Sequence, residues 1–166
     1  EFSFPKKCPV CSGEVKRQEG EAAYKCIDKK CQAKHREALY HFVSKKAFNI
    51  VGLGSEIIDK LADEGLIKDS GDIFKLEPKD LLGLEGFAEI SADKLVASIQ
   101  KSKKISLARF IYSLGIIHVG EETANLLAMY FNSMENLTLV SEEDLKKVSG
   151  IGEKAASSIK NWLDDK

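Results

Sequence analysis

The amino-acid sequence predicts a mainly α-helical protein with one small β-hairpin module at its N-terminal end. Two observations predict this fold class. All four cysteines lie between residues 8 and 31, whereas a pattern of glycine and apolar residues recurs four times between residues 50 and 159. Twelve glycines and three prolines among 166 residues are too few for a disordered or collagen-like chain.

The charge is divided unevenly along the chain, although the net charge is only −1. Residues 1–50 hold eleven Lys and Arg against six Asp and Glu, and residues 51–166 hold fourteen against twenty. Such a break is typical of two modules, and we assign residues 1–35 and 36–166 to two domains. Because the second domain is acidic, it can bind nucleic acid only through local geometry and not through bulk positive charge.

The cysteines form two close pairs, Cys8-Pro-Val-Cys11 and Cys26 to Cys31, with fourteen residues between the pairs. Two short loops that each present two thiolates suit a tetrahedral ion, and zinc is the ion we expect. The predicted ligands are Cys8, Cys11, Cys26 and Cys31. Since four thiolates leave no open coordination position, the zinc would be structural and not catalytic. Two disulfides are the alternative interpretation.

A small β-hairpin is expected between the two cysteine pairs, because residues 14–17 and 22–25 alternate in polarity and Gly13 and Gly20 suit turns. A segment of about 28 residues cannot bury a core large enough to hold itself folded. Zinc binding is therefore expected to supply its folding free energy. The three histidines are interpreted as ordinary residues and not as ligands; they are His35, His41 and His118.

After the cysteines the chain is predicted to be helical, beginning with the apolar stretch Ala38–Val43. A pattern then recurs around four equivalent positions, spaced by 34, 32 and 32 residues, which are Gly52, Gly86, His118 and Gly150. Each is flanked by apolar residues two positions before and one after, namely Ile50, Leu84, Ile116 and Val148, then Leu53, Phe87, Val119 and Ile151. A Gly or Ala follows two positions after, and aliphatic residues follow six and nine positions after. Such a repeat implies stacked supersecondary units.

Each unit is predicted to be a helix, a hairpin of two or three residues, and a second helix. The first glycine ends the first helix, because glycine adopts a positive φ without a Cβ clash. The apolar residue between the glycines packs into the core. The second glycine has no side chain, so another group can approach the backbone closely there. A small residue in the second helix, such as Ala124 or Ala156, allows the two helices to cross closely.

The hairpin and the start of the second helix expose unpaired backbone amides, and these amides together with the helix dipole favour a phosphate. A single such hairpin is more simply an interhelical turn, but four in register favour binding of both strands of a duplex across the minor groove, without reading the bases. The candidate DNA-binding residues are Gly52, Gly54, Gly86, Gly120, Gly150, Gly152, Lys60 and Lys154. Four further cations join copies two and three and are either DNA contacts or a solvated helix face; they are Lys101, Lys103, Lys104 and Arg109.

A four-Cys module that runs directly into four such repeats resembles the C-terminal half of bacterial NAD-dependent DNA ligases, over essentially the whole chain. The resemblance is carried by the cysteine spacing and by several stretches, which are Glu19-Gly20-Glu21-Ala22, His41-Phe42-Val43-Ser44-Lys45-Lys46-Ala47, Val51-Gly52-Leu53-Gly54, Leu84-Glu85-Gly86-Phe87, residues 108–116 and Val119-Gly120-Glu121. The second and third hairpins depart from the pattern at Ala88 and His118.

The resemblance implies a parent enzyme that seals nicks in duplex DNA with adenylate taken from NAD onto a lysine in a Lys-x-Asp-Gly motif. Here the nearest stretch, Lys68-Asp69-Ser70-Gly71, has Ser in place of that Asp. We therefore assign no catalytic residue to this chain and expect it to be inactive alone. NAD and magnesium would act only in the parent enzyme, whose adenylation and oligonucleotide-binding domains would lie upstream.

The expected partner is nicked duplex DNA, and the chain is expected to be monomeric, cytoplasmic and not bound to a membrane, since no apolar stretch is long enough to span a bilayer. A start without Met or an apolar leader further suggests a piece of a longer protein. Two alternatives remain open. One is a DNA repair scaffold with similar repeats and no ligase activity, and the other is a zinc-ribbon module that binds proteins.

Overall fold

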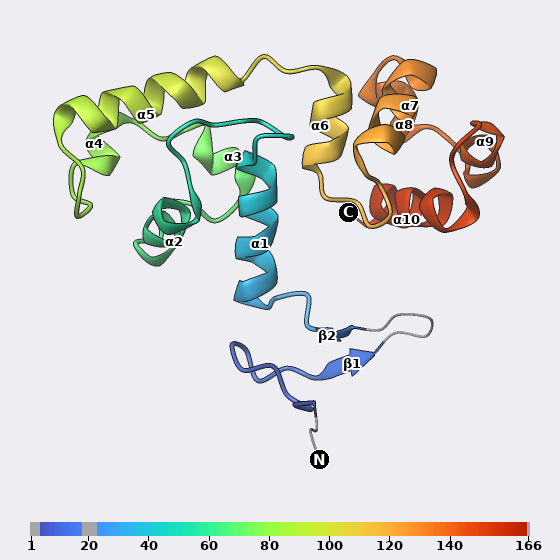
Figure 1. The fold of residues 1–166 in the computed structure, drawn as a ribbon, viewed down its shortest axis with the longest axis horizontal. Helices are drawn as coiled ribbons and strands as arrows, with labels where there is room; N and C mark the ends of the chain where they lie inside the picture. Colours follow the sequence, from blue (N-terminus) through green and yellow to red (C-terminus); the bar gives the residue numbers. More distant parts are fainter. Residues whose placement is uncertain (1–3, 18–22, 166) are drawn as a thin grey trace.

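The computed structural model describes residues 4–17 and 23–165 (Figure 1). These residues form a two-stranded sheet followed by helices, which confirms the mainly α fold class. The strands are β1 (Val15–Arg17) and β2 (Tyr24–Cys26). The helices are α1 (Gln32–Val43), α2 (Ser55–Asp63), α3 (Ser70–Ile73), α4 (Pro78–Leu81), α5 (Glu89–Ser102), α6 (Leu107–Ser113), α7 (Glu121–Phe131), α8 (Met134–Thr138), α9 (Glu142–Lys147) and α10 (Glu153–Asp164).

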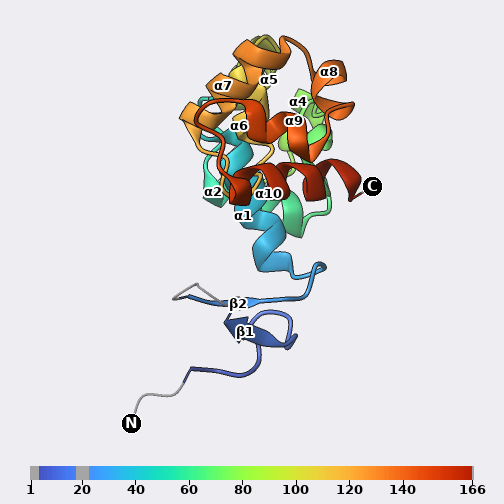
Figure 2. The ribbon, with the colours of Figure 1, turned by 90° about the vertical axis from the view of Figure 1, so that its right-hand side faces the viewer.

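The N-terminal module is the predicted β-hairpin. β1 and β2 pair antiparallel, with Val15 opposite Cys26 and Arg17 opposite Tyr24. The predicted turn at Gly20, and with it the stretch 19–22, lies outside the described residues. Figure 2 shows the hairpin below the helices, with α1 rising from it. The proposed domain boundary after residue 35 falls inside α1, so this one helix joins the cysteine module to the repeats.

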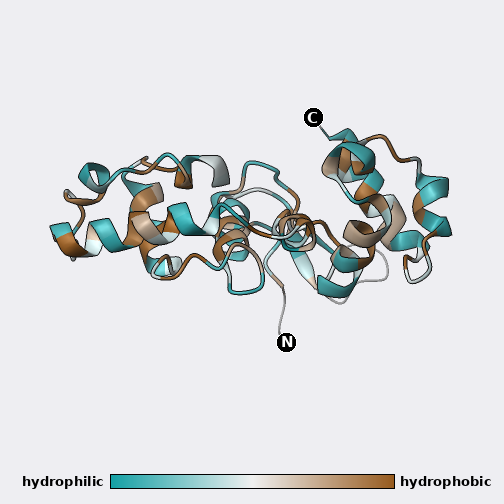
Figure 3. Cartoon of the chain, turned by 90° about the horizontal axis from the view of Figure 1, so that it is seen from above, coloured by the Kyte–Doolittle hydropathy of each residue, from teal (hydrophilic) through white to brown (hydrophobic). Residues whose placement is uncertain are grey.

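The four repeats are present as four helix–hairpin–helix units, and they pack in two pairs. The units are α1 with α2, α4 with α5, α6 with α7, and α9 with α10. The first two share one hydrophobic core that runs from Leu39 to Ile99, and the last two share a second core from Ile111 to Ile159. Short helices that the sequence analysis did not expect, α3 and α8, connect the units within each pair. Figure 3 shows the two groups of helices on either side of the molecule.

The core positions of the repeat are those that the pattern predicts, except that Phe87 in the second hairpin is only partly buried. Six and nine positions after the central residue, all the side chains are buried; they are Ile58, Ala92, Ala124 and Ala156, then Leu61, Leu95, Leu127 and Ile159. The apolar residues before each hairpin are buried as well, at Ile50, Leu84, Ile116 and Val148. Fully burying one aliphatic side chain is worth about 2 kcal/mol, so each repeat contributes several such increments to its pair.

The two pairs meet where α1 contacts α6. His41 shares a hydrogen bond of 2.7 Å with the carbonyl oxygen of Tyr112. Arg109 donates to the carbonyl oxygens of Ala47 and Lys45, which lie between α1 and the first hairpin. Arg109 is therefore not part of a solvated helix face: backbone carbonyls engage its guanidinium, which ties the second pair to the first. Contact of Arg109 with DNA stays a prediction.

Ion pairs join the cysteine module to α10 and, within the first pair of units, α1 to α2. Lys29, in the loop between the second pair of cysteines, forms an ion pair of 2.7 Å with Asp165 at the end of α10. Arg36 on α1 pairs with Asp59 and Asp63 on α2. In residues 4–17 and 23–165, no helix combines the length and the apolar character that crossing a membrane requires.

Candidate metal centre and nucleic-acid interface

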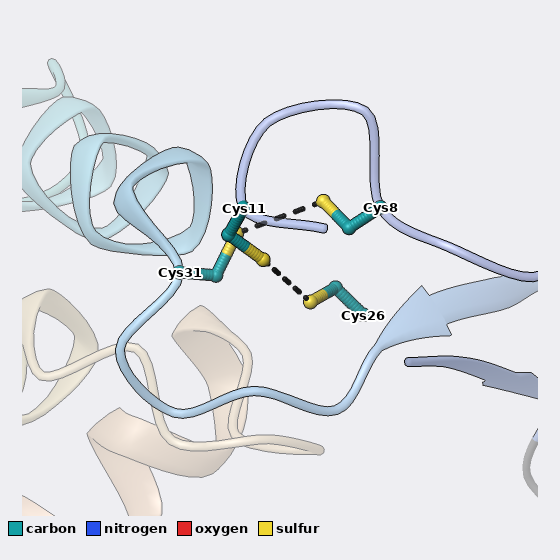
Figure 4. Close-up of side chains that lie close together, drawn as sticks. All are labelled: Cys8, Cys11, Cys26 and Cys31. Atoms are coloured by element: carbon teal, nitrogen blue, oxygen red, sulfur yellow. Dashed lines mark hydrogen bonds between the residues drawn. The ribbon is translucent and has the colours of Figure 1, made fainter. Parts of the chain in front are cut away.

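The four cysteines converge at one point, where the hairpin meets α1 (Figure 4). All four Sγ atoms lie within 4.8 Å of one another. The Sγ–Sγ distance is 3.8 Å between Cys8 and Cys31 and 3.5 Å between Cys11 and Cys26. Four sulfurs at about 2.3 Å from a tetrahedral zinc would stand about 3.8 Å apart. The predicted ligands therefore fit zinc.

The disulfide interpretation does not fit this site. A disulfide requires the two sulfurs to be about 2.05 Å apart, and both short Sγ–Sγ distances exceed that by more than 1 Å. All four cysteines are free. Hydrogen bonds from the amides of Cys11 and Val10 lower the pKa of Cys8 to about 7, whereas burial and the neighbouring thiols raise the pKa of Cys11 and Cys26. The positive charge of a bound metal is therefore what would hold all four as thiolates.

The site is built by local backbone structure. The amide of Gly13 donates to Cys11 Sγ over 3.4 Å, and an added Cβ at Gly13 would lie 2.9 Å from the Cβ of Asp28. Glycine is therefore required here by a close approach. Cys31 is the N-cap of α1, and its carbonyl accepts from the amide of His35. A metal held by these thiols would fix the starting point of α1.

The four predicted hairpins share one backbone conformation. The central residue has a positive φ in every copy: 90° at Gly52, 92° at Gly86, 65° at His118 and 95° at Gly150. In each copy, the residue after it donates to the carbonyl two positions before it, over 3.0 to 3.2 Å. A positive φ at the third residue with such a bond is the pattern of a type II turn. His118 thus adopts the left-handed conformation that glycine holds elsewhere.

The second glycine of the pattern has a different role, since it is the N-cap of the following helix. Gly54, Gly120 and Gly152 cap α2, α7 and α10 with φ of −86°, −86° and −79°, which any residue can adopt. An added Cβ would meet nothing within 4 Å at any of the three. Neither conformation nor packing within the chain therefore requires glycine at these positions, whereas close approach of a ligand would.

The amides at these helix starts are unpaired. At the first, third and fourth hairpins, no described residue accepts a hydrogen bond from the N-cap glycine or the three residues that follow it. The glycines themselves are exposed. Three groups of free N–H donors therefore lie at the positive ends of helix dipoles, in the geometry that binds phosphate.

The second hairpin is different, because the chain itself occupies its amide. The amide of Ala88 donates to the Ser91 hydroxyl over 2.8 Å, and that hydroxyl donates to the Ala88 carbonyl. The repeat pattern does not predict this capping arrangement, in which Ser91 takes the place that Glu or Gln holds in a capping box. Of the four hairpins, this one is the least suited to phosphate.

The two predicted lysines have different surroundings. Lys60 donates to the Glu85 carbonyl over 3.0 Å and thereby joins α2 to the second hairpin, so it also has a structural role. It lines a pocket between the first two hairpins together with Gly52 and Gly86. Lys154 is exposed on the first turn of α10 and forms no ion pair with a described residue. Lys154 is therefore the freer of the two cations.

Comparison with known families supports both parts of the site. The family described as NAD-dependent DNA ligase C4 zinc finger domain matches residues 7–33, and the helix-hairpin-helix motif family matches residues 109–166. The first match ends just after Cys31, and the second begins in α6.

Known proteins extend this similarity to almost the whole chain. A DNA ligase of Bacillus subtilis is 46% identical over 159 residues, which cover 96% of this chain and 24% of the ligase. A DNA ligase of Listeria monocytogenes is 47% identical over 162 residues, covering 98% and 24%. The chain thus spans about a quarter of the length of these relatives, and the resemblance to bacterial NAD-dependent DNA ligases is confirmed.

Proposed function

We propose that this chain binds the backbone of duplex DNA without sequence specificity, as the DNA-binding part of an NAD-dependent DNA ligase. The observation that carries the proposal is the set of three helix starts at Gly54, Gly120 and Gly152. Each offers unpaired amides beside a glycine that the chain's own structure does not require.

The chemistry of the contact follows from these groups. A phosphate oxygen accepts hydrogen bonds from the amides after each glycine, and the helix dipole favours its negative charge. The absent side chain allows the phosphate to approach the backbone. Since phosphates carry no sequence information, such contacts position the protein on the duplex without reading bases.

The pairing of units suits a ligand with two strands. The first core holds one free hairpin, at Gly54, and the second core holds two, at Gly120 and Gly152.

Acidic residues follow each of these glycines directly or at the next position, namely Glu56, Glu121, Glu122 and Glu153. Bulk positive charge is therefore not the main source of affinity at these sites. The backbone donors would supply it, and Lys154 would add one exposed cation beside Gly152.

The metal centre would hold the repeats in place. Cys8, Cys11, Cys26 and Cys31 would bind zinc, which supplies folding free energy to a module too small for a core of its own. Because Cys31 caps α1 and α1 packs in the first core, a fixed metal centre orients the first hairpin unit.

We assign nick sealing to the parent protein and not to this chain. The Lys-x-Asp-Gly lysine, NAD and magnesium would belong to upstream domains, and this chain would hold the nicked duplex while those domains act. The chain alone would be a monomer without ligase activity, working in the bacterial cytoplasm. The upstream reading frame should therefore encode a Lys-x-Asp-Gly motif, and a frame without it would favour a repair scaffold.

The test is binding of the zinc-loaded chain to fluorescent duplexes that are intact or nicked and differ in sequence. We expect affinity that does not depend on sequence and that falls as the salt concentration rises. Absence of binding at low salt would contradict DNA binding and favour the protein-interaction module, and binding that salt does not change would contradict contact with the phosphates.

A further inference from the structure

The tips of the four hairpins differ in a way that the fold does not explain. The tip is the residue just before the positive-φ position, and the four tips are Val51, Glu85, Ile117 and Ser149. Val51 and Ile117 are apolar, yet 70% and 62% of their surfaces are exposed. The equivalent Glu85 and Ser149 are polar and also exposed. Each core therefore carries one apolar tip and one polar tip.

Nothing in the turn requires an apolar residue at the tip. The same turn forms with Glu85 and with Ser149, with the same positive φ after the tip and the same hydrogen bond across it. β-branched side chains such as Val and Ile are not favoured in turns. No core residue covers Val51 or Ile117, so both leave apolar surface in water, which is unfavourable in the free chain.

The apolar tips lie beside free amides. Val51 precedes the unpaired amides that begin at Gly54, and Ile117 precedes those that begin at Gly120. A phosphate on either set of amides would bring its own nucleotide next to the tip. The second hairpin, whose Ala88 amide is already bonded to Ser91, has the charged tip Glu85. Apolar tips thus occur only at hairpins whose amides are available.

The first and third hairpins are also linked. Lys46, which lies just before the first hairpin, forms an ion pair with Glu121, the first residue of α7 after the third hairpin. Arg109 binds the carbonyl oxygens of Lys45 and Ala47 on either side of Lys46. These contacts link the segments that carry the two apolar tips.

We propose that Val51 and Ile117 pack against deoxyribose rings in the minor groove and thereby favour DNA over RNA. This inference rests on the proposed binding of duplex DNA. Beside a phosphate, the apolar surface that a DNA strand offers is the C–H surface of its sugars. In an RNA duplex the 2′-hydroxyls are displayed in the minor groove, where burial against Val or Ile would leave them without hydrogen-bond partners.

In the experiment, one variant carries both Val51→Ser and Ile117→Ser. Its affinity is compared with that of the unaltered chain, on a DNA duplex and on an RNA duplex of the same sequence. Burying two aliphatic tips predicts about a tenfold loss of DNA affinity in the variant. The salt dependence should stay the same, because no phosphate contact is removed. RNA affinity of the double variant should change by less than about twofold, because the two tips would not pack against sugars that carry 2′-hydroxyls.

Two controls keep the outcomes distinct. Leu139→Ser removes an apolar side chain that is 85% exposed and lies at the end of α8, outside the hairpin residues, and it should leave DNA affinity unchanged. Ser149→Val adds a third apolar tip and should raise DNA affinity. Unchanged DNA affinity in the double variant, or equal losses on DNA and RNA, would overturn the tip contact alone. If the unaltered chain binds no DNA, the proposed function fails and this inference with it.

Discussion

The Nε of Arg109 donates a hydrogen bond of 2.8 Å to the carbonyl oxygen of Ala47. A second bond of 2.7 Å runs from the same guanidinium to the carbonyl of Lys45. One side chain at the start of the second pair of units therefore holds the segment that leads into the first hairpin. Because a DNA duplex is stiff over this length, the spacing between hairpin pairs decides whether both can bind at once.

Replacing Arg109 with Met should weaken the contact between the two pairs of units while leaving both cores intact. Two hydrogen bonds from a charged donor are lost, so we expect the free energy of unfolding to fall by about 2 kcal/mol. We also expect a lower affinity for duplexes that are long enough to contact both pairs of units. Thermal unfolding and DNA binding measure the two effects. Arg109→Lys keeps the charge but cannot span both carbonyls, so it should be intermediate. If the Arg109→Met variant matches the unaltered chain in both assays, the Arg109 contact contributes neither to stability nor to DNA binding.

Removing zinc should unfold the cysteine module and spare the second pair of units. Cys26→Ser removes one of the four ligands and a chelator removes the ion itself, and the module has no core that could replace the metal. Amide NMR signals from β1 and β2 should collapse, whereas those of α7 and α10 should remain. Measured zinc should fall from one ion per chain to none. A hairpin that keeps its signals without metal would refute a structural zinc.

The repeats could be predicted from sequence because their physics is local. A positive φ at Gly52, Gly86 and Gly150 and burial at fixed offsets depend on residues close in the chain. The bond between Arg109 and Ala47 joins residues far apart in sequence, and no periodic signal marks it. The bond from Lys60 to Glu85 was missed for the same reason. His118 shows that the hairpin conformation survives without glycine, which the pattern alone does not tell.

Asp59 should make stability depend on pH at acid values. Hydrogen bonds from Tyr40 and Arg36 lower the pKa of Asp59 in the folded chain. A lowered folded pKa adds stability that is present above the unfolded value, about 3.9, and is lost as pH falls below it. Asp59→Asn should therefore lower the melting temperature by about 3 °C at pH 7, with a smaller difference at pH 3.

A matched variant tests whether this effect belongs to Asp59. Asp63 is the more exposed partner of Arg36, and 65% of the Asp63 side chain is exposed. Asp63→Asn should therefore lower the melting temperature by less than Asp59→Asn does. If the melting temperatures of the Asp59→Asn variant and the unaltered chain differ equally at pH 7 and pH 3, the lowered pKa has no consequence for stability.

Replacing Gly152 with Ser should separate folding from binding. Ser is a better N-cap than Gly, so the stability of α10 should stay the same or rise by a few tenths of a kcal/mol. The hydroxyl would occupy the free amides and its Cβ would fill the space left for phosphate, so DNA affinity should fall about tenfold. Gly83→Ser is the control, because Gly83 is equally open but precedes the second hairpin, where Ser91 already occupies the Ala88 amide. Equal affinity for the two variants would remove Gly152 from the interface.

The backbone amides at the three helix starts are the proposed phosphate contacts, and NMR can observe each of them. A short DNA duplex is titrated into the zinc-loaded, ¹⁵N-labelled chain while every amide signal is followed. We predict the largest shifts at residues 54–57, 120–123 and 152–155, and small shifts at Ala88, whose amide is already bonded to Ser91. If the duplex binds while these three groups stay unshifted and the signals of Lys101, Lys103 and Lys104 move instead, a charged surface binds the DNA and the account is contradicted.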